Sequence, residues 1–161
     1  MRFHPPMKFF LALIAVPALM VQAQAPDSIP VVNSENLDAY WISEKKVAPA
    51  YPTESLRKGE EGCVAVGFLI EADGTTSAHR AIASFPSRNF TESAIRAAEQ
   101  FVYRQSEQNP DRTAVFTTNS FTFQISRSPT ADERKQKKLE DRCKAAAEKA
   151  LNSDTGDSGA G

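Results

Sequence analysis

The amino-acid sequence predicts an α+β fold: a small three-stranded antiparallel sheet with helices packed on one face, followed by an extra C-terminal helix. Residues 63–72 place larger apolar side chains and smaller ones on alternate sides, as expected of a strand that packs on both faces. Asp73 and Gly74 follow at once, and this pair favours a hairpin turn because both residues tolerate left-handed backbone geometry. Residues 90–101 place alanine and phenylalanine side chains on one helical stripe, which is typical of a helix that packs on a sheet.

The N-terminal segment has the pattern of an export signal. The chain has 161 residues and a formal net charge of -1, which fits one domain with extensions and gives no positive field to attract nucleic acid. Its apolar run, residues 9–21, is interrupted by Pro17 and is shorter than the about 20 residues that a helix needs to cross a bilayer. We therefore expect residues 1–23 to be a signal peptide cut after Ala23, and the protein to be periplasmic. The alternative is an uncleaved anchor that holds the protein at the inner membrane, facing the periplasm.

The exported part begins with a polar extension and a short helix. Residues 24–46 are uneven in composition and predict a mostly irregular extension whose aromatic side chains dock on the domain. The domain itself is expected over residues 47–127. A short helix is predicted over residues 52–58, because Pro52 has its φ angle already fixed for a first helical position. Leu56 would supply its inward apolar contact.

The remaining elements of the domain follow from turn and capping residues. A second, weaker strand is expected over residues 75–84, directly after the hairpin turn. Asn89 then predicts a helix N-terminus, because it is a favourable N-cap residue and Glu92 follows three positions later. Residues 114–126 form the longest strand candidate, with apolar and aromatic side chains on one face.

The C-terminal part predicts a further helix and a tail. Thr130 and Glu133 have the spacing of a capping box, so a helix is expected over residues 128–151. Its apolar stripe consists mainly of alanine, which buries little area, so packing alone would hold this helix weakly. Residues 152–161 are rich in Gly, Ser and Asp and predict a disordered tail.

The two cysteines predict a disulfide. In an oxidising compartment, an even number of cysteines in a small exported domain usually pairs. A Cys63–Cys143 disulfide would fasten the C-terminal helix to the first long strand, on the face opposite Val64 and Phe68. A redox-active pair is the alternative, but such pairs normally have close spacing, as in Cys-x-x-Cys, which the sequence lacks.

The sequence offers little catalytic chemistry. His79 is the one histidine left after the predicted cut, and we expect it to face solvent on a strand. No G-x-S-x-G turn or phosphate-binding glycine loop occurs, and two histidines with two cysteines are too few for most metal centres. We therefore predict neither an enzyme, a metal site nor a cofactor.

Several short motifs occur in an order that resembles a known family. They are Ala50-Tyr51-Pro52, Gly59 and Gly62 around a turn, Asp73-Gly74, Ser84-Phe85-Pro86, Phe90 at the start of a helix, and the aromatic and β-branched run of residues 121–125. Each motif is common by itself, but together their order and spacing over residues 47–126 resemble the TonB C-terminal domain family.

This resemblance implies a binding role. Members of the family engage outer-membrane TonB-dependent receptors in the periplasm, in energy-dependent transport across the envelope. Binding is by β-augmentation, in which a receptor segment or a similar strand-donating partner adds beside the last strand of the domain. Carried over to this chain, Pro49 and Tyr51 would be lesser contacts, and the main contacts would be Val115, Phe116, Thr117, Thr118, Asn119, Ser120, Phe121 and Thr122.

The chain departs from full energy transducers in three places. Its apolar N-terminal run contains no Ser or His. Residues 24–46 contain only two prolines, Pro26 and Pro30, whereas full energy transducers carry a long proline-rich spacer. Residues 100–105 also differ from the Trp-x-Phe/Tyr-x-Pro pattern of the family. Two alternatives stay open: a TolA-like structural or adaptor protein whose C-terminal helix prevents strand addition, and a short membrane-anchored transducer. A homodimer through the last strand is a further alternative.

Overall fold

The computed structural model describes residues 28–125 and 129–156, and the side chains of residues 129–132 and 152–156 are not described. The predicted α+β class is confirmed, with a three-stranded antiparallel sheet and an additional C-terminal helix. The predicted signal peptide and the cut after Ala23 lie outside the described residues. In chain order the elements are η1 (Leu37–Ala39), β1 (Trp41–Lys45), α1 (Thr53–Lys58), β2 (Gly62–Ile70), β3 (Thr76–Phe85), α2 (Thr91–Ala98), β4 (Val102–Gln105), β5 (Val115–Phe123) and α3 (Pro129–Gly156).

The main sheet has the order β3-β2-β5, and both neighbours of β2 are antiparallel to it. The β2–β3 hairpin turns at Asp73 and Gly74, as predicted. Gly74 has a φ angle of 84°, and a Cβ atom there would lie 1.9 Å from the carbonyl oxygen of Tyr103. Glycine is therefore required at this position for two reasons. Its φ angle is positive, and the backbone of Tyr103 in β4 approaches too closely to leave room for a side chain.

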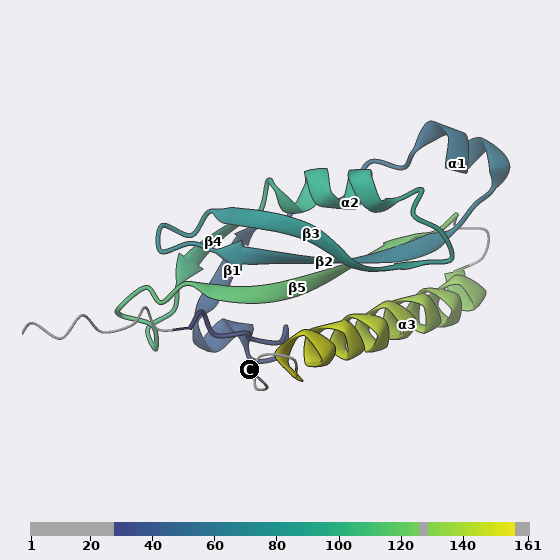
Figure 1. Ribbon diagram of the computed structural model, residues 1–161. Helices are drawn as coiled ribbons and strands as arrows, with labels where there is room; N and C mark the ends of the chain where they lie inside the picture. The colour runs from purple at the N-terminus through teal and green to yellow at the C-terminus, as the bar shows by residue number, and fades with distance from the viewer. Residues whose placement is uncertain (1–27, 126–128, 157–161) are drawn as a thin grey trace, which may run out of the picture.

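Both faces of β2 are covered (Figure 1). On one face, α2 packs over Val64, Val66, Phe68 and Ile70, all of them fully buried. The predicted stripe of α2 is buried against them, and it consists of Phe90, Ala94, Ala97, Ala98 and Phe101. On the opposite face α3 covers a smaller cluster of Cys63, Ala65, Cys143 and Ala147. The bulky side chains therefore form the main core between the sheet and α2.

A second sheet, β1 paired with β4, was not foreseen from the sequence. The helical stripe was predicted to reach residue 101, but α2 ends at Ala98 and the chain is extended from Val102 to Gln105. Residues 24–46, expected to be mostly irregular, contribute η1 and β1. Trp41 is 1% exposed and its indole N–H donates to the Thr113 carbonyl at 2.9 Å. These two short strands stabilise each other across a long stretch of sequence, which local patterns do not reveal.

Several local expectations are wrong in detail. Asn89 is not the N-cap of α2, because Phe90 holds that position and the Asn89 amide donates to Glu60 Oε2 at 2.9 Å. Leu56 points outward and is 51% exposed, whereas Ser55 is the buried residue of α1. Helix α3 continues to Gly156, so the first residues of the predicted disordered tail are helical. Residues 157–161 lie outside the described part.

The contrast between Phe68 and Leu56 gives a test of this core. Phe68→Ala removes a fully buried ring, so the free energy of unfolding should fall by about 3–5 kcal/mol. Leu56→Ala should change it by less than about 0.5 kcal/mol, because the side chain is largely in solvent. Urea unfolding followed by tryptophan fluorescence measures both values. Similar losses in the two variants would contradict the assignment of the core to the α2 face.

Candidate functional site

Strand β5 forms one edge of the main sheet. It pairs with β2 in a continuous register from Gly62↔Phe123 to Ile70↔Val115, with no bulge. At its beginning, the extended residues 30–32 bind the opposite edge of β5: the N–H of Val32 donates to the Phe116 carbonyl at 2.8 Å, and the N–H of Phe116 donates to the Pro30 carbonyl at 2.9 Å. The backbone groups of Phe116 therefore point away from β2.

The direction of the Phe116 backbone groups shows which later residues of β5 also point their N–H and C=O groups away from β2. Alternate residues of a strand direct their N–H and C=O groups to the same side, so those of Thr118, Ser120 and Thr122 also point away from β2. Within residues 28–125 and 129–156, no other backbone segment pairs with these three residues. One weaker contact exists, since the Asn119 side-chain amide approaches the Ser120 carbonyl at 3.4 Å. We call residues 118–122 the open edge.

The other edge of the sheet is irregular. The pairing of β3 with β2 shifts register twice, between Ala65 and Val66 and between Gly67 and Leu69. Ala78 of β3 has a φ angle of 50°, which is unusual for a residue with a side chain. Bulges of this kind twist an edge and interrupt its ladder, so they hinder the addition of another strand. The regular edge of the sheet is therefore the one on β5.

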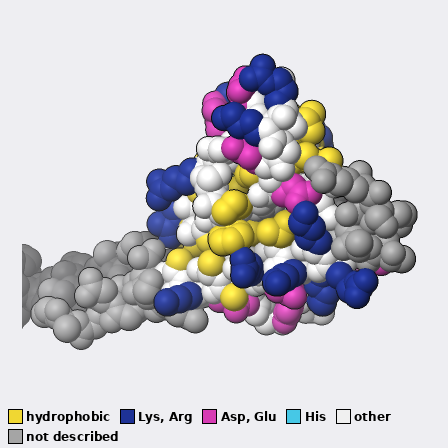
Figure 2. Space-filling view, turned by 90° about the vertical axis from the view of Figure 1, so that its right-hand side faces the viewer, with side chains coloured by type: hydrophobic (Ala, Val, Ile, Leu, Met, Phe, Trp, Pro, Cys, Tyr) yellow, Lys and Arg dark blue, Asp and Glu magenta, His cyan; other side chains and the backbone are white. Residues whose placement is uncertain are grey.

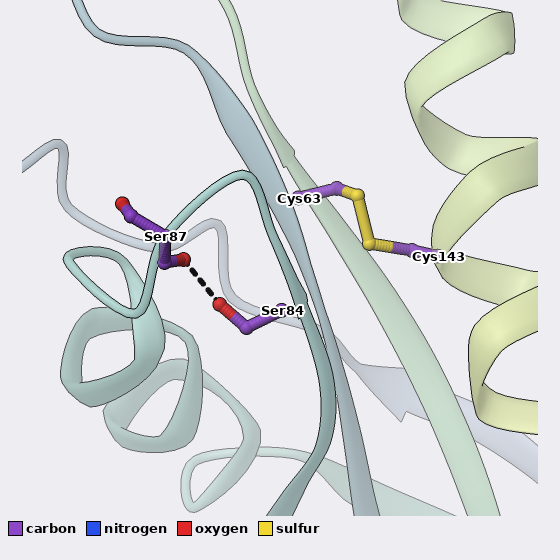
Figure 3. Close-up of a disulfide and its surroundings, with 4 residues drawn as sticks. All are labelled: Cys63, Ser84, Ser87 and Cys143. Atoms are coloured by element: carbon purple, nitrogen blue, oxygen red, sulfur yellow. Dashed lines mark hydrogen bonds between the residues drawn. A yellow bond between two sulfur atoms is a disulfide. The ribbon is translucent and has the colours of Figure 1, made fainter. Parts of the chain in front are cut away.

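Helix α3 packs on the face of the sheet that carries Cys63 and Ala65 of the central strand, opposite α2 (Figure 1). Its attachment is covalent, because Cys63 of β2 and Cys143 of α3 lie at disulfide distance, with 6.1 Å between their Cα atoms (Figure 3). Lys135 adds an ion pair to Glu61, and the Arg142 guanidinium lies 4.7 Å from the centre of the Phe85 ring. The bridge to the central strand thus keeps α3 on the small-residue face.

The eight residues predicted on β5 divide into two sets. Val115, Thr117 and Phe121 point into the main core and are buried, so their side chains are unavailable to a partner. Those of Thr118 and Thr122 are partly exposed, as are Phe116, Asn119 and Ser120. Phe116 is already hydrogen-bonded to residues 30–32, a contact that was not predicted from the sequence. The short apolar stretch of residues 29–32 was the available signal for it.

Pro49 and Tyr51 have different surroundings from the β5 residues. The Tyr51 ring packs edge-on against Phe90 and Phe123, with centroids 5.6 and 5.7 Å away, and its hydroxyl donates to the Glu60 carbonyl. Burial, aided by nearby Glu61 and Glu60, raises the pKa of the Tyr51 phenol. Pro49 lines a shallow groove of about 530 Å³ between its segment and α2. Tyr51 therefore holds the segment to the core rather than presenting a free surface.

The end of the molecule near α1 carries a band of apolar surface, which Figure 2 shows between charged side chains. Leu56 of α1 and Phe85 at the end of β3 are among the exposed large apolar residues, at 51% and 40%. Arg142 covers one face of the Phe85 ring. These two side chains belong to α1 and β3 and not to β5.

Comparison with known proteins identifies the domain. A family model described as the C-terminal region of the Gram-negative bacterial TonB protein matches residues 47–125. This chain carries a TonB C-terminal domain. The solution structure of the Pseudomonas aeruginosa TonB C-terminal domain is 25% identical, with a TM-score of 0.52 over 60% of this chain and 96% of that one. TonB2 of Vibrio anguillarum is 22% identical, with a TM-score of 0.40 over 78% and 100%. No curated protein matches the chain.

The TonB C-terminal domain family is one of periplasmic binding and energy transduction, and its members interact with outer-membrane receptors in general. In the described part of this chain, no group of three or more His, Cys, Asp or Glu side chains could hold a metal ion. None of the helices within residues 28–125 and 129–156 is long and apolar enough to cross a membrane.

His79 lies on β3 and is only partly exposed, whereas the sequence predicted a side chain that faces solvent. Its ring stacks on Phe68 with centroids 5.9 Å apart, and Nε2 lies 3.0 Å from the Thr76 hydroxyl. Burial lowers the pKa of His79 below its ordinary 6.5, although Glu99 and a hydrogen bond to Ala98 act in the opposite direction. Protonation of His79 therefore opposes folding.

This shift predicts a pH dependence of stability. Because the unfolded chain binds the proton more readily, the stability contributed by neutral His79 is present above pH 6.5 and is lost as pH falls through the folded-state pKa. His79→Gln should flatten the thermal midpoint between about pH 5 and 7. The measurement is a series of thermal melts of both proteins across this range. Parallel curves would show that another group causes any acid sensitivity.

The disulfide predicts the behaviour of α3 on reduction. Closing a loop with a sequence separation of 80 residues stabilises by up to about 4.5 kcal/mol in the chain-entropy model, and the α3 face buries few large side chains. Cys143→Ser should therefore expose the basic residues of α3 to trypsin, while the sheet stays folded. Ala145→Ser, an exposed position on the same helix, is the control. Equal cleavage rates for α3 in the two variants would mean that packing alone holds the helix.

Proposed function

We propose that this protein is an exported, periplasmic binding domain that takes an extended segment of an outer-membrane TonB-dependent receptor, or a similar strand-donating protein, as an additional strand along β5. Its role would lie in energy-dependent transport across the cell envelope. The observation that carries the proposal is the open edge, where Thr118, Ser120 and Thr122 direct outward backbone groups that pair with no other backbone segment of residues 28–125 and 129–156.

The chemistry of such an edge suits partners of varied sequence. Each added backbone hydrogen bond contributes about 0.5–1.5 kcal/mol net, and the bonds do not depend on which side chains the partner carries. The pairing of β5 with β2 has no register shift, whereas that of β3 with β2 has two. The β5 edge therefore favours a longer ladder of backbone hydrogen bonds with a partner than the β3 edge does. Of the eight residues predicted on β5, we keep Thr118, Ser120 and Thr122 as the hydrogen-bonding positions.

The location of α3 bears on the alternatives. A structural or adaptor role without strand addition required the helix to block the edge, yet α3 packs on the sheet face and is attached to the central strand. The cysteine pair at disulfide distance supports export, because cysteines persist as disulfides in oxidising compartments. We keep the predicted cut after Ala23 and the domain boundaries at residues 47 and 127 as part of the proposal.

A proline at the open edge tests strand addition. Ser120→Pro removes an outward N–H that has no partner within the described residues, so it should spare the fold, since edge strands tolerate proline on their open side. It should abolish binding of a peptide copied from the strand-donating segment of a receptor. Ser120→Ala, which keeps the N–H, should bind as the unmodified protein does. Fluorescence anisotropy measures binding, and thermal melts check the fold of both variants.

Hydrogen exchange gives an independent readout that needs no variant. The amides of Thr118, Ser120 and Thr122 should exchange rapidly in the free protein and become protected when the peptide binds. Slow exchange in the free protein, or binding that leaves these amides unprotected, would contradict the proposal.

A further inference from the structure

The open edge ends in a groove at the Phe116 end of β5. The groove has a volume of about 550 Å³ and is bounded by residues 31–36, by Thr118 and by the last turns of α3. These three elements come from the beginning, middle and end of the described chain, and Figure 1 shows the N-terminal segment beside the C-terminal end of α3. Any strand that adds to the edge must approach this groove with one of its ends.

Residues 30–32 act as a stop for such a strand. They occupy the backbone groups of Phe116, so the ladder available to a partner begins at Thr118. The chain then turns away, with the N–H of Asn36 bonded to both the carbonyl and the side-chain oxygen of Asn33, at 3.2 and 3.0 Å. Because the stop is part of the same chain, it limits where the ladder of a partner can begin.

The groove carries uncompensated negative charge. Glu35 and Glu148 line it, both are exposed, and neither has an ion-pair partner among the described side chains. The one cation of the lining, Lys144, is engaged by Glu140 at 3.2 Å. Apolar side chains lie beside the carboxylates, with Val31 52% exposed and Leu151 also in the lining.

Strand geometry determines which side chain of a partner enters the groove. Thr117 and Phe121 point into the main core, so Thr118 directs its side chain to the α3 face of the sheet. A residue paired directly beside Thr118 places its own side chain on the same face. That side chain therefore points toward the end of α3, where Glu148 lies.

We propose that this groove selects a strand with a lysine or arginine at the position beside Thr118. The aliphatic stem of the basic residue lies on Val31 and Leu151, and its charged head lies between Glu35 and Glu148, as long cationic side chains do at mixed surfaces. This inference rests on the proposed function, since the backbone ladder of the open edge supplies most of the affinity. The groove adds register and charge selectivity.

The proposed selectivity for a basic residue depends on the disulfide, because the disulfide holds Glu148 of α3 beside the groove. Glu148 belongs to α3, and Cys143 on the same helix is joined to Cys63 of the sheet. If reduction releases α3, Glu148 leaves the groove while the open edge on β5 remains. Reduction should therefore diminish the preference for a basic residue more than it diminishes strand binding itself.

Selection of displayed random peptides tests the inference without a known receptor. The full chain, exported by its host so that the cysteines oxidise, is the bait. Peptides recovered from it should carry lysine or arginine at one fixed position. A Glu35→Gln/Glu148→Gln double variant should recover peptides without this preference, and Glu107→Gln, an exposed carboxylate elsewhere, should retain it.

Affinity measurements then separate the contribution of the groove from that of the backbone ladder. For a recovered peptide, the double variant should weaken binding about threefold to tenfold at low salt, as expected for two exposed charge pairs. Replacement of the basic residue in the peptide by alanine should remove that difference. High salt should reduce it as well.

The outcomes are distinguishable. Peptides that bind without a basic preference, yet lose binding in Ser120→Pro, would overturn the groove and leave the strand-addition proposal standing. Peptides that bind equally well to Ser120→Pro, or no recovered peptides at all, would overturn strand addition itself. A basic preference that emerges only after deletion of residues 157–161 would mean that the tail of this chain occupies the groove, which would also overturn the inference.

Discussion

The rest of this structure depends on the burial of both faces of β2. Hydrophobic packing of α2 buries one face, and a helix attached by a disulfide covers the other. One face carries Val64, Val66, Phe68 and Ile70, which supply enough apolar area to hold α2 by hydrophobic packing. The other face presents Cys63 and Ala65, and a Cβ atom on Gly67 would lie 2.6 Å from the Phe116 ring. This face buries fewer large side chains than the other, and a covalent bond supplements the packing. The helix is thereby placed over the sheet, and the β5 edge is left open.

The parts of the fold that the sequence predicted are those set by local patterns. The alternation around Val64, the turn at Asp73 and Gly74, and the stripe that includes Phe90 each depend on neighbours a few residues away. The cysteine pairing was also predictable, because two cysteines allow a single pairing within one chain. The motif order indicated the family even though each motif is short.

What the sequence did not predict depends on contacts between distant segments. Strand β4 exists because β1, about sixty residues earlier, pairs with it from Trp41↔Gln105 to Lys45↔Val102. Asn89 looked like a helix cap, but the fold brings Glu60 within hydrogen-bond distance of its amide. At the site, the sequence predicted residues 115–122 of β5 as one continuous set of contacts, without showing which of them point their backbone groups away from β2. The alternation that selects Thr118, Ser120 and Thr122 required the contact at Phe116.

The cysteine pair also closes a covalent ring through the molecule. The ring runs from Cys63 to Cys143 and contains β2, β3, α2, β4 and β5, whereas β1 and α1 precede it. A single break of the peptide chain anywhere inside the ring leaves the two fragments joined as one molecule. A break before Cys63 removes the covalent link to the N-terminal fragment, which is then held by non-covalent contacts alone. This topology places the strand that we propose binds the partner in the section of the chain where one proteolytic cut leaves a single molecule.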